Sequence, residues 1–504
     1  MKKKILIGGI IAAAVGVCVT VFLYFFLIRS IDVFGKEFPV GSEEIALSGE
    51  SISGMDELTE ILKPFHRLKK LDLGDYTVNV KEEERFNAAF PQTELICRRV
   101  VDLYGETTFC DSTEVDLTGK DLSDLTKLRA ALPYFTRLER VVSGDGVIPL
   151  TELESLEKDF PGVRFCITAL VDVYGQTLRS DVTEIDLKGA AVGADLADLL
   201  AHFPDLKEVD LHGAGLAGAD QLALAEAFPD VTFAWEVELF GTVYDYTVEE
   251  LDFTGNTDAT PDLIRKYARL FPCLKRLDMS ECGASDEEMA ALREDLPGVK
   301  VVWRLYMGDF TLKTDDVTFA VLIRKDDPRK QLRSEDIQVL RYCTDLRALD
   351  LGHQLITDIS VIGDYLPELR VLILADNQIT DISPLSKLKH LHYLELFVNG
   401  RGLCDLTPLA SCRELVDLNI SYLYGFKDFS PLMDLPLLER LWLENTSVTK
   451  GQLKELENRY PNAVIVTEGK GSVDQGWRTH RRYYAMLDMF YHNYLSEAFS
   501  KYDR

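Results

Sequence analysis

The chain contains 504 residues, and its 83 acidic against 55 basic side chains give a formal net charge of −28 at pH 7. All of the acidic residues follow residue 29, so the long region after it repels the phosphate groups of nucleic acids, and we expect no nucleic-acid partner. Length alone suggests several domains, but the internal repeats described below predict one elongated solenoid with two arms.

The first predicted element is a membrane-spanning helix over residues 5–28, which contain no charged side chain. Such a helix is about 36 Å long, which is enough for a bilayer core of about 30 Å. Lys2, Lys3 and Lys4 precede it, and the positive-inside tendency therefore predicts a cytoplasmic N-terminus and an extracellular C-terminal body. No Ala-x-Ala site follows, so residues 1–29 are interpreted as a retained signal-anchor rather than a cleaved signal peptide.

A long-period repeat follows over residues 30–308. Related motifs, of which Glu-Ile-Asp-Leu-Lys-Gly is one copy, begin at Glu44, Glu114, Glu184 and Glu250. Apolar residues between the predicted strands recur at helical spacing. Each copy is therefore predicted to contain two solenoid turns with true helices on the outer face.

A second kind of segment occurs in these copies. It is rich in β-branched and aromatic residues and leads to an aromatic-Gly pair, as at Tyr104, Tyr174 and Phe240. This composition predicts a strand, a turn and another extended piece. Whether the four expected excursions are hairpins or elongated loops is open, and their simplest role is to protect a sheet edge.

Short repeats occupy residues 346–466, after an expected junction over residues 309–345. Their opening leucines, separated by 23, 22, 24 and 23 residues, are Leu346, Leu369, Leu391, Leu415 and Leu438. A fixed period in this range predicts an α/β leucine-rich-repeat solenoid, in which a curved parallel sheet carries helices or short helical turns on its convex face. Leu372 and Leu394 are predicted to point into the core.

The short repeats resemble those of internalin-like bacterial proteins over about residues 346–448. The long repeats together with the junction resemble membrane-anchored leucine-rich-repeat proteins of Gram-positive bacteria, and this resemblance covers nearly all of the chain beyond residue 40. The internalin-like resemblance implies a protein-recognition surface on the concave sheet and no catalytic residue, whereas the second resemblance implies a layout and no assigned activity.

The predicted binding surface follows from the strand geometry. Counted from the opening leucine, the third, fifth, seventh and eighth residues of each short turn project from the concave sheet, because strand side chains alternate between faces. The set combines aromatic rings, arginine and flanking charge, as binding hot spots do. The predicted ligand-binding residues are Asp350, His353, Tyr393, Glu395, Phe397, Asp417, Asn419, Tyr422, Arg440, Trp442 and Glu444.

Residues 467–504 are predicted to form a linker and an amphipathic helix. One face of the helix consists of Tyr483, Leu487, Phe490, Tyr494 and Ala498. Three roles are open for it. It caps the open end of the solenoid, it binds a partner or a membrane surface, or it folds back and covers the aromatic rings of the concave sheet.

Chemistry-bearing motifs are absent from the sequence. It contains no phosphate-binding loop, no nucleophile elbow and no metal-ligand spacing, so we expect no enzymatic activity, no metal and no cofactor. Cys97 and Cys110 flank the first Tyr-Gly pair. They either form a disulfide in an oxidising compartment or stay as buried thiols.

Three classes of function compete. The favoured class is a membrane-anchored extracellular module that binds a protein or a glycan through its concave sheet. The second is a structural or assembly scaffold of the cell envelope, which an apolar patch along the Tyr-Gly edge would favour. The third is an enzyme with a site built from loops, which requires a deep pocket with convergent polar groups.

Overall fold

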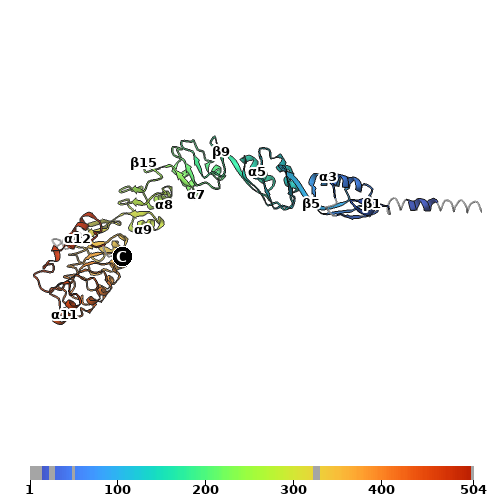
Figure 1. Ribbon diagram of the computed structural model, residues 1–504. Helices are drawn as coiled ribbons and strands as arrows, with labels where there is room; N and C mark the ends of the chain where they lie inside the picture. The colour runs from blue at the N-terminus through green and yellow to red at the C-terminus, as the bar shows by residue number, and fades with distance from the viewer. Residues whose placement is uncertain (1–13, 22–28, 48–51, 322–329, 501–504) are drawn as a thin grey trace, which may run out of the picture. The chain divides into compact units, whose positions relative to one another are not determined.

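The computed structural model describes residues 14–21, 29–47, 52–321 and 330–500 (Figure 1). The chain divides into an N-terminal unit, Met1–Gly215, and a C-terminal unit, Leu216–Arg504. Most of the expected membrane-spanning segment lies outside the described residues, and residues 14–21 form an exposed helical stretch. In the part of the chain that is described, no helix is both long and apolar enough to cross a bilayer.

The N-terminal unit alternates strands with short helices. In chain order its elements are β1 (Ser30–Val33), β2 (Lys36–Pro39), β3 (Glu44–Ala46), α2 (Met55–Leu62), β4 (Lys70–Asn79), α3 (Val80–Ala89), β5 (Glu94–Leu103), β6 (Glu106–Phe109), β7 (Glu114–Asp116), α4 (Thr126–Ala131), η3 (Leu132–Tyr134), β8 (Arg140–Pro149), α5 (Leu150–Asp159), β9 (Arg164–Val173), β10 (Gln176–Arg179), β11 (Glu184–Asp186), α6 (Leu196–Leu200) and β12 (Glu208–Asp210). Buried aliphatic and aromatic side chains fill the space between the strands and these helices.

Each long repeat in this unit contains three parallel strands, so the expectation of two turns per copy is wrong. Strands β3, β4 and β5 pair in parallel in one copy, and β7, β8 and β9 do so in the next. The strand before each aromatic-Gly pair was predicted, but its parallel pairing with the sheet was not, because one long strand pairs with two neighbours. The first part of β5 continues the parallel sheet, while its last residues, from Val100 to Leu103, pair antiparallel with β6.

The excursions at the aromatic-Gly pairs are true hairpins. Strand β5 pairs with β6, and β9 pairs with β10, both antiparallel. Both central turn residues have positive φ, 49° at Tyr104 with 86° at Gly105, and 50° at Tyr174 with 85° at Gly175. Tight hairpin turns of this kind match the right-handed twist of the flanking strands. The hairpin β1–β2, which turns at Phe34, is a further copy that the sequence analysis did not single out.

The C-terminal unit begins with the last long repeats and continues into the short ones. Its elements are α7 (Gly218–Ala227), β13 (Thr232–Ala234), β14 (Glu236–Leu239), β15 (Thr242–Asp245), β16 (Glu250–Asp252), α8 (Pro261–Tyr267), η4 (Ala268–Leu270), β17 (Arg276–Asp278), α9 (Asp286–Asp295), β18 (Lys300–Val302), β19 (Arg304–Met307), β20 (Phe310–Lys313), β21 (Thr318–Ala320), η6 (Asp336–Tyr342), β22 (Ala348–Asp350), α10 (Ser360–Tyr365), β23 (Val371–Ile373), η7 (Ser383–Lys387), β24 (Tyr393–Glu395), η8 (Thr407–Ser411), β25 (Asp417–Asn419), η9 (Ser430–Asp434), β26 (Arg440–Trp442), α11 (Lys450–Arg459), β27 (Val464–Val466), η10 (Trp477–Thr479) and α12 (Arg481–His492).

The short repeats form a seven-stranded parallel sheet, β21 to β27 in sequence order. The pairing places Leu349, Leu372 and Leu394 in register on neighbouring strands, and all three side chains are fully buried. The predicted inward direction of Leu372 and Leu394 is therefore confirmed. The sheet starts at β21, inside the segment that was expected to be only a junction.

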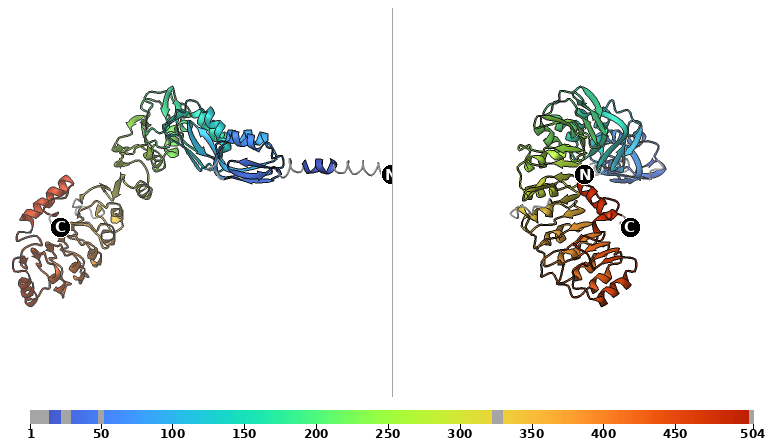
Figure 2. Two further views of the ribbon diagram at one scale, coloured as in Figure 1. Left: turned by 45° about the vertical axis from the view of Figure 1, so that its right-hand side comes forward. Right: turned by 90° about the vertical axis from the view of Figure 1, so that its left-hand side faces the viewer.

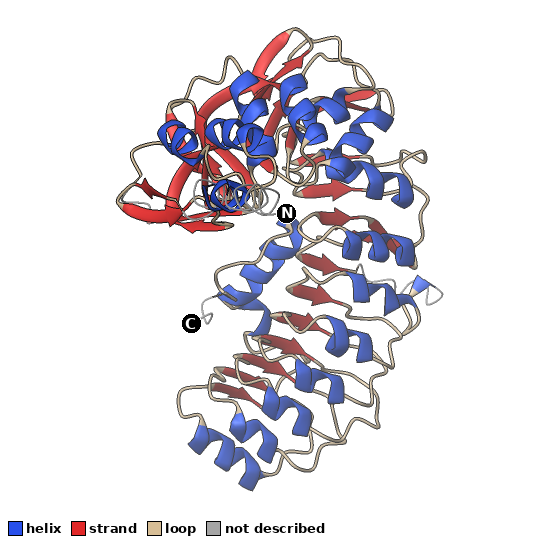
Figure 3. Cartoon of the chain, turned by 90° about the vertical axis from the view of Figure 1, so that its right-hand side faces the viewer, coloured by secondary structure: helices blue, strands red, loops and turns tan. Residues whose placement is uncertain are grey.

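Short helices return the chain along one face of this sheet (Figure 3). The turns η7, η8 and η9 begin at Ser383, Thr407 and Ser430, each followed by proline. Proline fixes φ near its helical value and needs no N–H partner at the first helical positions. The predicted helical turns are therefore confirmed.

The C-terminal helix α12 lies on the opposite face of the same sheet (Figures 2 and 3). We call this face of β21–β27 the concave face, and residues 471–500 the C-terminal cover. The interpretation of the helix as a cap over the open end of the solenoid is wrong. Met486 and Met489 of the helix are instead buried against the aromatic rings of the concave face, which was the third of the roles considered. The predicted apolar face is only partly correct, because Leu487 and Tyr494 are exposed.

Candidate binding site

The predicted ligand-binding residues do lie together on or beside the concave face, but they do not form an open surface. Tyr393, Glu395, Phe397, Asp417, Asn419, Arg440, Trp442 and Glu444 are all buried. Asp350, His353 and Tyr422 are partly buried. The expectation of an exposed patch is therefore wrong, because the C-terminal cover occupies it. That these residues contact a partner stays a prediction.

Trp477 is the central aromatic contact of the cover, and its side chain is fully buried. Its ring lies 5.3 Å from the ring of Tyr393 and 5.0 Å from that of Trp442, measured between centroids. The guanidinium of Arg440 lies 4.5 Å above the same ring, and Trp477 Nε1 donates a hydrogen bond of 2.7 Å to Glu395. One side chain of the cover thus joins two strands of the sheet, β24 and β26.

Asp417 is the electrostatic centre of the site. Arg440, from the neighbouring strand, donates two hydrogen bonds of 2.9 Å to its carboxylate. Arg482, from α12, donates two more, of 2.8 and 2.6 Å. Burial raises the pKa of Asp417, but the hydrogen bonds from Arg482 and Arg440 outweigh it and hold that pKa below its ordinary value. Asp417 is therefore a charged anchor for the cover.

Two other carboxyls beneath the cover, Glu395 and Asp350, have no such cation bonded to them within the described part of the chain. Glu395 accepts hydrogen bonds from the neutral donors Tyr393 and Trp477, and burial raises its pKa. Asp350 accepts one from the backbone N–H of Gly352, and burial raises the pKa of Asp350 to about 7, with the charge of Glu395 adding to the rise. Both side chains line one small cavity of about 170 Å³.

Hydrogen bonds hold both ends of the cover. Asn419 Nδ2 donates to the carbonyl of Ser472, and Trp442 Nε1 donates to the carbonyl of Asp474. Beyond α12, Asn493 Oδ1 accepts from the backbone N–H groups of Val317 and Thr318, at 2.8 and 2.9 Å. The cover therefore extends from the last strands of the sheet back to the first.

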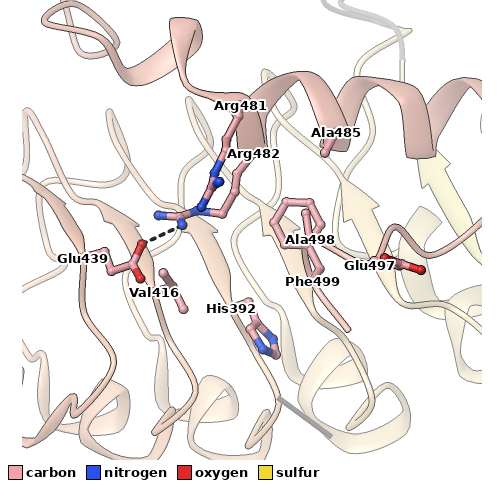
Figure 4. Close-up of a pocket in the computed structure, with 9 residues that line it drawn as sticks. All are labelled: His392, Val416, Glu439, Arg481, Arg482, Ala485, Glu497, Ala498 and Phe499. Atoms are coloured by element: carbon pink, nitrogen blue, oxygen red, sulfur yellow. Dashed lines mark hydrogen bonds and ion pairs between the residues drawn. The ribbon is translucent and has the colours of Figure 1, made fainter. Parts of the chain in front are cut away.

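A second cavity, of about 350 Å³, lies between the cover and the edge of the sheet (Figure 4). Arg481 and Arg482 come from the first turn of α12, while Glu439 and His392 come from the residues that precede two strands. Arg482 bonds Glu439 across this cavity at 2.6 Å. The cavity is a feature of the closed arrangement, because the cover forms one of its walls.

The eighth position of the short turns has a special backbone conformation. His353, Val398 and Tyr422 have φ of 63°, 57° and 59°. Positive φ is unfavourable for residues other than glycine, most of all for a β-branched residue such as valine. Val398 and Tyr422 line a shallow groove of about 600 Å³ at the edge of the sheet. Tyr422 therefore belongs to this edge, whereas His353 lines the cavity beneath the cover.

The described residues contain no arranged metal-ligand group and no activated thiol. Across the described ranges, no group of three or more His, Cys, Asp or Glu side chains is arranged to hold a metal ion. Cys97 and Cys110 are free thiols, and burial raises the pKa of Cys97 to about 11. A thiol with so high a pKa is a poor nucleophile at neutral pH.

Residues 367–411 match the family model for leucine-rich repeats, in two copies. This segment is a leucine-rich-repeat array. The match lies within the parallel sheet β21–β27, so the predicted α/β leucine-rich-repeat fold is confirmed there. No curated protein matches the chain.

Several solved leucine-rich-repeat structures are similar to this chain. An internalin C2 from Listeria monocytogenes is 22% identical, with 46% of this chain and 87% of that chain covered, at a TM-score of 0.26. An internalin from the same organism is 16% identical, with 72% and 84% covered, at a TM-score of 0.24. A leucine-rich-repeat protein from Leptospira interrogans is 14% identical, with 84% and 96% covered, at a TM-score of 0.26. These likenesses assign no partner to the chain.

Trp477 and Arg482 are the site residues that the sequence analysis missed. Both stand at the start of the predicted amphipathic helix, outside the helix face that the sequence analysis assigned. The sequence did contain one signal for them. Asp417 was placed on the concave face beside aromatic residues, and an aspartate in such surroundings needs a cationic partner. Which segment neutralises that aspartate depends on contacts over 65 residues of chain, which no local period encodes.

Proposed function

We propose that this chain is a membrane-anchored protein-binding module whose leucine-rich repeats lie outside the cell. The anchor is the uncharged run of residues 5–28, and the three lysines before it support a cytoplasmic N-terminus. The partner is a protein that presents a helical segment to the concave face. The C-terminal cover occupies that face and has to leave before the partner enters.

The observation that carries this proposal is the composition of the contact between the cover and the concave face. Its centre is made of tryptophan, tyrosine, methionine and arginine side chains, which are the residues enriched at protein interfaces. Charged groups are fully buried in it, including Asp417 and Arg440. Ordinary domain cores rarely bury charge. The concave face thus has the properties of a receptor for a helical peptide.

This chemistry favours a protein ligand over a glycan, since the face already accommodates a helix with its backbone and side chains. It also favours a binding module over an envelope scaffold. The large apolar side chains exposed on the hairpins, Phe109, Val243 and Tyr306, occur singly on separate hairpins. Single exposed apolar residues are normal on soluble surfaces and mark no assembly patch.

The topology is tested with protease added to intact cells. If the repeats lie outside, the protease removes the chain beyond residue 30 and leaves a short membrane-bound fragment. Detection with antibodies against the C-terminal cover checks this result, and a cytoplasmic protein in the same cells is the control for lysis. Full protection of the chain in unlysed cells, with digestion after lysis, would contradict an extracellular C-terminal body.

The binding surface is tested by cutting the cover free. We expect that a protease site inserted between Gly469 and Lys470, both exposed, yields a cover that dissociates on dilution and rebinds when added as a peptide of residues 470–500. Arg482→Ala in that peptide weakens rebinding by at least about 100-fold, because Asp417 loses the one of its two bidentate partners that the cover supplies. Titration calorimetry measures the affinity.

Tyr484→Ala is the matched control peptide, since Tyr484 is 58% exposed on the outer side of α12 and its loss should leave rebinding unchanged. Circular dichroism of the cut protein shows whether the sheet stays folded. If the cover never exchanges, or if the sheet unfolds as soon as the cover leaves, the concave face is a core and not a binding site.

A further inference from the structure

The carboxyl groups beneath the cover fall into two classes. Asp417 is bonded to two guanidinium groups, whereas Asp350 and Glu395 accept hydrogen bonds only from neutral donors among the described residues. Asp350 and Glu395 line the same cavity, so their negative charges repel when both are ionised. Closing the cover over them costs free energy whenever they are charged, because a buried carboxylate without a cation is unfavourable.

The charged and titratable groups that face this pair come from several elements. His353 lies after β22, and Arg478 and Tyr483 come from the cover. Trp477 and Tyr393 donate to Glu395, while the charge of Arg478 favours the ionised form of both carboxyls. Arg478 is exposed to solvent, which screens its charge. The buried Arg440 also favours the ionised form of Glu395, but its hydrogen bonds go to Asp417. Burial therefore outweighs both arginines at this pair.

We propose that ionisation of Asp350 and Glu395 releases the C-terminal cover, so that the concave face closes in mildly acidic medium and opens as the pH rises through neutrality. This inference rests on the proposed function, and it names the regulation of the same site. The cover and the sheet are the two parts of the switch. Burial beneath the cover favours the neutral form of both carboxyls, and exposure to water favours the charged form.

The direction follows from linkage. In the closed form the pKa of Asp350 is about 7, whereas in the open form the carboxyl is in water and has its ordinary value near 3.8. At a pH between these two values the carboxyl is ionised in the open form and protonated in the closed form. Closure must therefore take up a proton, and it weakens as the pH rises. The dissociation constant of the cover should rise about tenfold per pH unit in this window for one group. Glu395 acts in the same direction.

Two groups oppose this trend. His480 caps α12, and burial together with the charges of Arg440 and Arg482 lowers its pKa in the closed form, so closure weakens below about pH 6.5 on its account. Asp417 has a lowered pKa, and its contribution is lost only as the pH falls below its ordinary value of 3.8. The pKa of Asp350 rises to about 7 and that of Glu395 rises as well, so we expect the two carboxyls to dominate over His480 from about pH 5 to pH 7.

The test is the pH profile of the cut protein described above. For the unsubstituted chain, the dissociation constant of the peptide 470–500 should rise by at least about tenfold between pH 5.5 and pH 7.5. Asp350→Asn and Glu395→Gln replace each carboxyl with a neutral group of the same shape. Each should flatten the profile and tighten binding at pH 7.5.

Glu455→Gln, at an exposed carboxyl of α11, is the control and should leave the profile unchanged. His480→Gln should steepen the acidic side of the profile. A flat profile for the unsubstituted chain, or an unchanged slope in both carboxamide variants, overturns this inference while the binding surface stands. Failure of the cover to exchange at every pH defeats the proposed function itself, so the two failures are distinguishable. Circular dichroism confirms that each variant is folded.

Discussion

Replacing Tyr393 and Trp442 with alanine will strongly destabilise the C-terminal unit, although both residues look like surface hot spots in the sequence. Both side chains are at most 1% exposed to solvent. Truncation of a buried large aromatic residue costs about 3–5 kcal/mol. Each single variant should therefore lower the free energy of unfolding by this amount. Urea unfolding followed by circular dichroism measures it.

The two losses will not add. Both rings contact Trp477, so removal of one already loosens the packing of the other, and residues that share a partner are coupled. Tyr393→Ala also removes a donor to the buried Glu395. Tyr424→Ala is the matched control, because that ring is 64% exposed and its loss should change stability by about 0.5 kcal/mol or less. Unchanged stability in the double variant would show that the cover is undocked in solution.

The sheet of the short repeats could be predicted because its determinants are local and periodic. One leucine in each turn occupies the same inward position, as Leu372 and Leu394 do, and parallel pairing in register follows from stacking equal turns. The parallel pairing of the third strand of each long repeat could not be predicted this way, although the strand itself was. In β5 the parallel and the antiparallel pairing share one continuous strand, so no break in the pattern separates the two.

The composition of the site could be predicted, but its accessibility could not. Strand alternation correctly placed Tyr393, Asp417 and Trp442 on the face away from the helical turns. The same pattern describes an open binding surface and a covered one, because both need aromatic rings on the outer side of the strands. The difference is made by Trp477 and Arg482, whose contacts with the sheet join residues far apart in the chain.

The second large effect is expected at Asp417. Its replacement by alanine leaves Arg440 and Arg482 buried beside each other without the carboxylate that both of them bind. Breaking a buried ion pair by removing one partner costs about 3–5 kcal/mol, since the remaining charge is uncompensated. Asp417→Ala should lower the free energy of unfolding at pH 7 by this amount, as measured by urea unfolding.

Asp434→Ala is the control, because Asp434 is an exposed carboxyl on the opposite side of the same repeats, and its loss should change stability by about 0.5 kcal/mol or less. Combining Asp417→Ala with Arg482→Met tests the cause. Removal of one stranded guanidinium relieves part of the charge, so the double variant should be more stable than Asp417→Ala alone. If the second substitution instead adds its full independent cost, the two side chains are not coupled, and the cover is not anchored at Asp417.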